Sequence, residues 1–263
     1  MHEKLAALEA SLRSHAPLVI AYSGGVDSAY LLAEAHRVLG PGMLGVIADS
    51  PSLPRQALAD ALALAEQIGA PVEVVQTAEL ENPDYASNPV NRCYFCKAEL
   101  FQRLDQLAVA RGFRAIAYGE NADDMQHFRP GREAAEEFAV IAPLRDAGLT
   151  KVEIRARSRE LGLPTADAPA QPCLSSRIPH GTPVTTEALG MVERGEAAVR
   201  RLGFQVFRVR HLASEGSAPR ARVQIAPDEM PRLGSIRAEI EQGLLSAGYS
   251  AVEIDPAGYR SPA

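Results

Sequence analysis

The stretch Ile20-Ala-Tyr-Ser-Gly-Gly-Val-Asp-Ser28 joins a short apolar run to an amphipathic pattern, and it decides the fold. The run 18–21 suits a buried strand, and the apolar positions after the glycines recur at helical spacing. Gly24 and Gly25 open backbone angles that other residues avoid and let a ligand approach the chain closely. The stretch therefore predicts a strand, a tight turn and a helix.

The backbone N–H groups of this turn would converge at the start of the helix and form an anion site. The turn lacks the Lys of a Walker A loop, so it predicts a different class of phosphate-binding loop. The alternative is a turn whose small residues serve packing alone. The residues predicted to bind a phosphorylated ligand are Ser23, Gly24, Gly25, Val26, Asp27 and Ser28.

Strand and helix patterns alternate through the first half of the chain. Strands are predicted at 18–22, 43–48, 72–76, 115–118 and 140–144. Helices are predicted at 27–39, 54–68, 97–111 and 151–161. This alternation is typical of an α/β fold with a doubly wound parallel sheet, whose ligands bind at the carboxyl ends of the strands.

Five prolines, at 164, 169, 172, 179 and 183, mark a long loop after this half. A long loop in a compact chain usually has a function or links domains. The pattern beyond it predicts a small α+β unit with helices at 185–202 and 228–248 and strands at 205–211, 221–226 and 251–254. We therefore expect a nucleotide-binding domain at 1–165, a linker at 166–183 and a C-terminal domain at 184–263.

Composition argues against several classes of protein. The chain has 263 residues and a net charge of −6, so its overall field does not favour nucleic acid. No stretch reaches the ~20 apolar residues of a membrane span, and the N-terminus lacks the apolar core of a signal peptide. We expect a soluble cytoplasmic protein with neither nucleic acid nor membrane as partner. Three cysteines argue against a disulfide framework and indicate metal or catalytic use.

The three cysteines lie in two short polar segments, at Cys93, Cys96 and Cys173. A Cys-x-x-Cys pair just before the predicted helix at 97–111, with a remote third Cys, suits a [4Fe–4S] cluster with one open iron. A structural zinc site with His180 as the fourth ligand is a second hypothesis. Cys173 acting alone as nucleophile or sulfur donor is a third, and buried thiols without a role are the fourth.

Polar residues also follow the predicted strands. Asp49 and Ser50 follow the second strand, at the edge of the sheet where ligands of such folds bind. The segment after the fourth strand supplies Gly119, Glu120, Asn121, Asp123 and Asp124, which bind a ligand or merely cap a helix. Arg208 and Arg210 alternate along a strand and share one side of it, which suits a phosphate or a solvated face.

Four motifs occur in order: Ser-Gly-Gly-Val-Asp-Ser at 23–28, Asn-Arg-Cys-Tyr-Phe-Cys-Lys at 91–97, Gly-Glu-Asn-Ala-Asp-Asp at 119–124 and Pro-Cys-Leu-Ser-Ser-Arg-Ile at 172–178. The first resembles the pyrophosphate loop of the PP-loop ATP pyrophosphatases. Together, and over nearly the whole chain, the four resemble the LarE family of ATP-dependent sulfur transferases. That family serves nickel-pincer cofactor synthesis and lactate racemase maturation.

The resemblance implies an activity. The family uses Mg-ATP to adenylate a carboxylate of pyridinium-3,5-biscarboxylic acid mononucleotide, releases pyrophosphate, and forms a thiocarboxylate, twice per substrate. Some members sacrifice the sulfur of one Cys, at the position of Cys173, and others are thought to deliver sulfur from a [4Fe–4S] cluster. This chain has the three-Cys pattern of the second group. The rival functions are an amide synthetase such as NAD or GMP synthetase, a tRNA thiolase, and a non-catalytic ATP-binding module.

The resemblance also assigns roles. It implies catalysis by Asp27, Cys173, Arg177 and Glu196. It implies ATP binding by 23–28, Asp49, Ser50 and Gly119, with Mg²⁺ on Asp27. It implies that the substrate phosphate lies on Arg177, Arg208 and Arg210. Family members form hexamers, so we expect a homo-oligomer.

Overall fold

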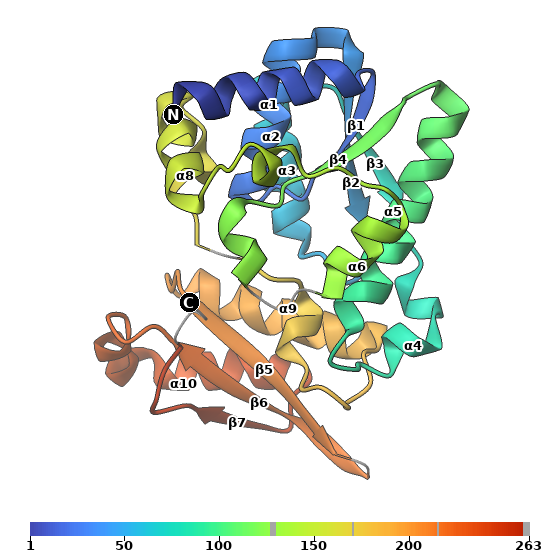
Figure 1. Ribbon diagram of the computed structural model, residues 1–263. Helices are drawn as coiled ribbons and strands as arrows, with labels where there is room; N and C mark the ends of the chain where they lie inside the picture. The colour runs from blue at the N-terminus through green and yellow to red at the C-terminus, as the bar shows by residue number, and fades with distance from the viewer. Residues whose placement is uncertain (127–129, 170, 215, 260–263) are drawn as a thin grey trace. The chain divides into compact units, whose positions relative to one another are not determined.

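The computed structural model describes residues 1–126, 130–169, 171–214 and 216–259, which form two compact units (Figure 1). The first unit comprises Met1–Glu79 and Asn91–Ala168, and the second comprises Leu80–Val90 and Pro169–Ala263. Nothing in the sequence pattern predicted that 80–90 belong to the second unit. The expected functional domains at 1–165, 166–183 and 184–263 stay a prediction.

A four-stranded parallel sheet organises the first unit. Its strands are β1 (Leu18–Ala21), β2 (Met43–Asp49), β3 (Val72–Gln76) and β4 (Ala115–Tyr118), in the order β3-β2-β1-β4. The chain moves outward from β1 to β3 and then returns to pair β4 with the other side of β1. This reversal confirms the doubly wound α/β fold and creates a switch point at the carboxyl ends of β1 and β4.

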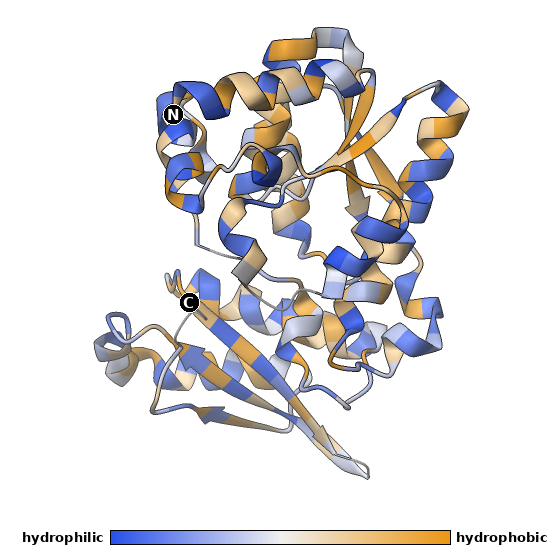
Figure 2. Cartoon of the chain, in the orientation of Figure 1, coloured by the Kyte–Doolittle hydropathy of each residue, from blue (hydrophilic) through white to orange (hydrophobic). Residues whose placement is uncertain are grey.

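Helices cover both faces of this sheet (Figure 1). One face holds α1 (His2–His15), α2 (Val26–Leu39), α3 (Arg55–Ile68) and α8 (Lys151–Glu160), and the other holds α5 (Arg92–Arg111) and α6 (Pro130–Glu137). Side chains of β1 alternate between the two cores, with Leu18 and Ile20 in one and Val19 and Ala21 in the other. Figure 2 shows mainly apolar residues in the central strands, and β1 is buried along its whole length, as expected of a parallel strand covered on both faces.

Two predictions for the first unit were wrong. The predicted strand at 140–144 is a single bridge from Ala117 to Ile141, because Pro143 starts the short helix α7 (Pro143–Asp146). The predicted helix at 97–111 starts at Arg92, so Cys93 and Cys96 lie inside α5 rather than before it. The missed signal is Tyr94, which packs with Ala98 and Phe101 on one face of the helix.

The second unit is a three-stranded sheet, β5 (Phe207–Ser214), β6 (Ser217–Ile225) and β7 (Ala251–Ile254), in the order β5-β6-β7. Helices α9 (Thr186–Arg201) and α10 (Leu233–Ser246) pack on one face against residues such as Val209 and Val223. In Figure 2, apolar and polar bands alternate along β5 and β6, as expected of a sheet with one buried face. The predicted helix at 228–248 divides into a 3-10 turn at Met230–Arg232 and α10.

Candidate active site

The turn between β1 and α2 has the geometry of a phosphate-binding loop. Gly24 has a φ of +73°, and a Cβ there would lie 2.7 Å from the Cβ of Ala61, so the turn requires glycine. The Ser28 hydroxyl donates to the Gly25 carbonyl at 3.0 Å and accepts from the Ser23 backbone N–H at 3.2 Å. The Ser23 and Ser28 hydroxyls are 3.0 Å apart. These bonds shape the turn, and the first N–H groups of α2 have no acceptor within the helix.

The end of β4 meets this turn at the switch point. A Cβ at Gly119 would lie 2.7 Å from the Ser28 backbone nitrogen and 2.9 Å from the Asp27 carbonyl carbon. A glycine at this position is therefore what allows the segment 119–124 to approach the first turn of α2. The structure thus brings together two of the predicted motifs, 23–28 and 119–124.

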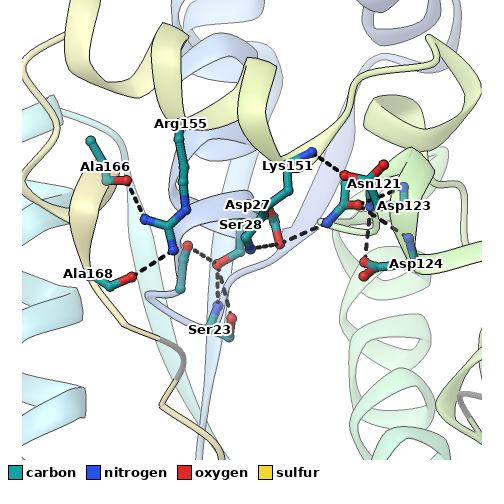
Figure 3. Close-up of polar contacts among 11 residues, drawn as sticks. Ser23, Asp27, Ser28, Asn121, Asp123, Asp124, Lys151, Arg155, Ala166 and Ala168 are labelled. Carbon is teal, nitrogen blue, oxygen red and sulfur yellow. Dashed lines mark hydrogen bonds and ion pairs between the residues drawn. The ribbon is translucent and has the colours of Figure 1, made fainter. Parts of the chain in front are cut away.

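Asp27 is the charged centre of this region (Figure 3). Its Oδ2 accepts from Lys151 Nζ at 2.7 Å and from Asn121 Nδ2 at 3.3 Å. Its Oδ1 is buried and has no hydrogen-bond partner among the residues that the structure describes. A carboxylate oxygen available in this way fits Mg²⁺, which prefers one or two carboxylates together with phosphate oxygens.

The segment 119–124 serves structure as well as contact with Asp27. Asn121 Oδ1 accepts from the backbone N–H of Asp123 at 2.9 Å and of Asp124 at 3.3 Å. Asp123 Oδ2 accepts from the backbone N–H of Lys151 at 2.7 Å, which fixes the start of α8. Asp123 and Asp124 thus hold the loop, as the capping interpretation predicts, while Asn121 also reaches the Asp27 carboxylate.

Glu120 is buried, with 3% of its side chain exposed, and balances two arginines. It accepts from Arg132 Nε at 2.9 Å, Arg145 Nη1 at 2.8 Å and the Tyr118 hydroxyl at 2.6 Å. Burial alone would raise the pKa of Glu120, but the hydrogen bonds from Tyr118 and Arg132 and the two arginine charges hold it below its ordinary value. Glu120 is therefore an anion that orients two guanidinium groups.

Asp49 and Ser50 lie at the carboxyl end of β2. Asp49 pairs with Arg55 and accepts from Gln76 Nε2 at 2.8 Å. Burial raises its pKa, but the bonds from Arg55 and Gln76 outweigh burial and keep the pKa low. The Ser50 hydroxyl accepts from the Ser52 backbone N–H at 3.1 Å, and Ser50 is buried. The predicted ATP contacts stay a prediction.

The first turn of α5 carries two of the three cysteines. Cys93 is exposed and Cys96 is half-buried, and their i, i+3 spacing puts both on one face of the helix. Two accessible thiols on one helix face fit the donor chemistry of an iron–sulfur or zinc site. Among the described residues, the structure contains no group of three or more His, Cys, Asp or Glu side chains arranged to hold a metal ion. Cys173 belongs to the second unit, and the convergence of the three thiols stays a prediction.

Arg177 fixes the segment that carries Cys173. Its Nη1 donates to the carbonyls of Pro172 at 2.6 Å and Cys173 at 3.1 Å. Its Nε and Nη2 donate to the Glu196 carboxylate at 2.8 and 3.0 Å, and only 4% and 8% of these two side chains are exposed. Glu196 also accepts from the Val209 backbone N–H at 3.2 Å. Two predicted catalytic residues thus form a buried ion pair that positions Cys173.

Residues 80–90 support the same segment from outside the four motifs. Asn88, fully buried at a φ of +59°, donates to the carbonyls of Pro179 and Thr182 at 2.8 Å. The Tyr85 and Ser175 hydroxyls lie 2.8 Å apart. These contacts explain why the short helix α4 (Pro83–Ala86) belongs to the second unit.

Arg208 and Arg210 share one face of β5, as predicted, and Val209 between them packs in the core on the opposite face. Arg208 stacks over the Tyr259 ring at 4.5 Å, and Arg210 donates to the Ser176 carbonyl at 2.7 Å. Burial and the nearby Arg177 charge lower the pKa of both guanidinium groups. Arg177 pairs with Glu196, and the guanidinium groups of Arg208 and Arg210 lie close enough to this pair to sense its charges, so this group of side chains suits an anion.

Sequence reasoning missed Lys151, Arg132, Arg145 and Asn88. Lys151 is the first residue of the predicted helix at 151–161, and the preceding Thr150 is a typical N-cap residue. This signal could have placed Lys151 at a helix N-terminus. No motif marked the other three: Arg132 and Arg145 pair with Glu120, and Asn88 donates to the carbonyls of Pro179 and Thr182. In the part of the chain that the structure describes, no helix has the length and apolar character needed to cross a membrane.

No protein-family model matches the chain. An uncharacterized protein of Synechocystis sp. is 44% identical over 245 residues, which cover 92% of this chain and 90% of that protein. The GMP synthase [glutamine-hydrolyzing] of Thermomicrobium roseum is 30% identical over 209 residues, which cover 70% of this chain and 39% of that protein.

The pyridinium-3,5-bisthiocarboxylic acid mononucleotide synthase of Lactiplantibacillus plantarum is 31% identical over 264 residues. The match covers 98% of this chain and 92% of that protein, so it includes the turn 23–28, the three cysteines and the strand that carries Arg208 and Arg210. With this relative, the chain belongs to the LarE family of sulfur transferases.

Proposed function

We propose that this protein is an ATP-dependent sulfur transferase that converts the carboxylates of pyridinium-3,5-biscarboxylic acid mononucleotide into thiocarboxylates. The observation that carries the proposal is the meeting of the turn 23–28 with the loop 119–124 around Asp27, whose Oδ1 is buried and lacks a partner among the described residues. That geometry supports binding of Mg-ATP phosphates. The relative named for the bisthiocarboxylic acid product supports the substrate.

Activation of the carboxylate is the task of the first unit. A carboxylate cannot expel oxide, so an oxygen of the substrate attacks the α-phosphorus of ATP and pyrophosphate leaves. The N–H groups of the turn and the Ser23 and Ser28 hydroxyls would stabilise the departing pyrophosphate by preorganised electrostatics. Asp27 would hold Mg²⁺ on the same phosphates through Oδ1. The acyl-adenylate that results has AMP as a leaving group.

Sulfur transfer replaces AMP. A sulfur nucleophile forms the C–S bond as the bond to the AMP oxygen breaks. Cys93, Cys96 and Cys173 would hold a [4Fe–4S] cluster, which would supply a transferable sulfur atom when bound. Arg177 would keep the Cys173 segment in place through its carbonyl contacts. In the alternative route, Cys173 attacks and its Cβ–Sγ bond then breaks, which leaves dehydroalanine.

Recognition of the substrate phosphate is the task of the second unit. Arg208 and Arg210 lie on one face of β5 close to the Arg177–Glu196 pair, and we propose that they bind the phosphate of the mononucleotide. We further propose that the protein works as a homo-oligomer, a hexamer as in its family.

The test is product analysis with Mg-ATP, the pyridinium mononucleotide and sulfide under anaerobic conditions. AMP, pyrophosphate and a thiocarboxylate product are expected, whereas ADP and phosphate would refute adenylation. Asp27→Asn should abolish AMP formation while the protein stays folded. Alanine at Cys93, Cys96 or Cys173 should abolish sulfur transfer and leave AMP formation largely intact.

One variant separates the two sulfur routes. If Cys93→Ala still transfers one sulfur per chain and leaves dehydroalanine at position 173, Cys173 is a sacrificial donor. The match to a GMP synthase favours an amide synthetase as the second candidate function. An amide formed from ammonia, with no thiocarboxylate formed from sulfide, would establish that second candidate.

A further inference from the structure

Lys151 is an unusual choice of residue for this chain. The sequence contains three lysines, at 4, 97 and 151, against 24 arginines. A lysine presents a compact charge with three rotatable donors, whereas an arginine presents a rigid fork of five. Lys151 is therefore one of the few positions in this chain where the positive charge is a lysine ammonium and not an arginine guanidinium.

The backbone of Lys151 is tightly fixed. Lys151 is the first residue of α8, and its N–H donates to Asp123 Oδ2 at 2.7 Å. Thr150 and Glu153 form a reciprocal capping box around the same turn, and Lys4 Nζ binds Glu153 at 2.7 Å. These bonds fix the backbone of Lys151 at the switch point, while its flexible four-carbon side chain can still adjust the position of the ammonium group.

The ammonium group lies beside Asp27, at the start of α2 (Figure 3). Nζ is 2.7 Å from Asp27 Oδ2, and 37% of the side chain is exposed. One of its three N–H donors serves Asp27, so two remain for other acceptors on the exposed side. Asp27 is the second residue of α2, so an anion at the first N–H groups of that helix would come close to Nζ.

Charge balance at the turn calls for such a cation. Residues 23–28 contain no Lys or Arg, and Asp27 adds a negative charge where the β- and γ-phosphates would bind. We infer that Lys151 is a pyrophosphate ligand, whose ammonium donates to the β- or γ-phosphate of ATP and to the departing pyrophosphate while it neutralises Asp27. Lys151 supplies from a distant helix the charge that a Walker A loop carries within itself. The inference rests on the proposed function and names a residue for it.

The competing explanation is structural. In it, Lys151 only neutralises Asp27 and ties α8 to α2. The two explanations differ once Asp27 is made neutral, because a lysine that only serves Asp27 then has nothing left to do for ligand binding.

The experiment measures binding of inorganic pyrophosphate by titration calorimetry in EDTA, so that no metal contributes. The proteins are wild type, Lys151→Met, Asp27→Asn and the double variant, with circular dichroism to verify folding. Lys151→Met should weaken binding at least about tenfold, and it should do so again in the Asp27→Asn background. Lys151→Arg should recover part of the affinity, because it restores charge without the same geometry.

Arg159→Met is the matched control. It removes another cation of α8, whose ion pair is with Asp167 and not with the capped first turn, and it should leave pyrophosphate affinity unchanged. If the double variant binds pyrophosphate as well as Asp27→Asn alone, the inference is overturned while the proposed function stands. If wild type binds neither pyrophosphate nor its magnesium complex, the inference and the pyrophosphate-forming step fail together.

Discussion

Removing one member of the Arg177–Glu196 pair should destabilise the second unit severely. Both side chains are almost fully buried, and breaking such a pair from one side costs about 3–5 kcal/mol. Glu196→Ala also orphans the Val209 N–H, which is worth about 1–3 kcal/mol, although the two losses are not additive. We therefore expect a loss of about 4 kcal/mol and a fall in melting temperature of roughly 10 °C.

The assay is urea and thermal unfolding followed by far-UV circular dichroism, because the chain has no tryptophan to report by fluorescence. Arg177→Met should be comparably unstable, since it leaves the Glu196 carboxylate buried with only the Val209 N–H. The double variant Arg177→Met/Glu196→Gln should be more stable than Arg177→Met, because it removes that charge and keeps the acceptor. If either single variant lost less than about 1 kcal/mol in free energy of unfolding, each charge would not depend on its partner for burial, and the reasoning would be refuted.

Three further results are expected. Glu153→Gln should cost about 1 kcal/mol at pH 7, because Gln can keep the capping box but loses the ion pair with Lys4 and the favourable negative charge at the helix N-terminus. Bonds from Lys4 and the Thr150 N–H lower the pKa of Glu153 to about 2, so this stabilisation is present above the ordinary pKa of 4.5 and disappears as pH falls toward 2. Urea unfolding at pH 7 and pH 3 should therefore show a smaller difference in stability between wild type and variant at pH 3. Gly119→Ala should abolish measurable ATP binding and lower the melting temperature, because its Cβ would lie 2.7 Å from the Ser28 backbone nitrogen. Gly25→Ala, whose Cβ would have its nearest contact at 3.6 Å, should lower the melting temperature less in the same thermal unfolding assay. Arg208→Ala and Arg210→Ala should each weaken calorimetric binding of the mononucleotide about tenfold or more, with a smaller effect on folding as judged by thermal melts. Wild-type affinity in both variants would show that this strand face is merely solvated.

The fold of the first unit was predictable because its signals are local. The strands at 43–48, 72–76 and 115–118 are short apolar runs between helical patterns, and the structure places β2, β3 and β4 at or within one residue of them. The strand predicted at 140–144 failed because the apolar run there is real, but Pro143 turns the chain after one bridge. The run predicts burial correctly, and only tertiary pairing decides whether it becomes a strand.

The candidate site was predictable only where a motif carries the chemistry within itself. The turn 23–28 and the loop 119–124 were found in this way, and the structure brings them together. Lys151 and Asn88 act across 124 and about 90 residues of sequence, so no local pattern could assign them. The early start of α5 was missed because Asn-Arg-Cys-Tyr-Phe-Cys reads as a polar motif, whereas its aromatic face packs as a helix.

One helix start explains why the nucleotide turn needs residues so far along the chain. Residues in the first turn of α8 make three contacts with other segments. The Lys151 N–H donates to Asp123, the Lys151 ammonium pairs with Asp27, and the Glu153 carboxylate pairs with Lys4. One turn further, Arg155 donates to the Ala166 and Ala168 carbonyls, the latter at 2.9 Å, where the first unit ends (Figure 3). A capped helix is rigid at its N-terminus, so these contacts are set relative to one another within the first unit. A perturbation of the Thr150 cap should therefore alter pyrophosphate binding without touching the turn, because it moves the lysine and not the glycines.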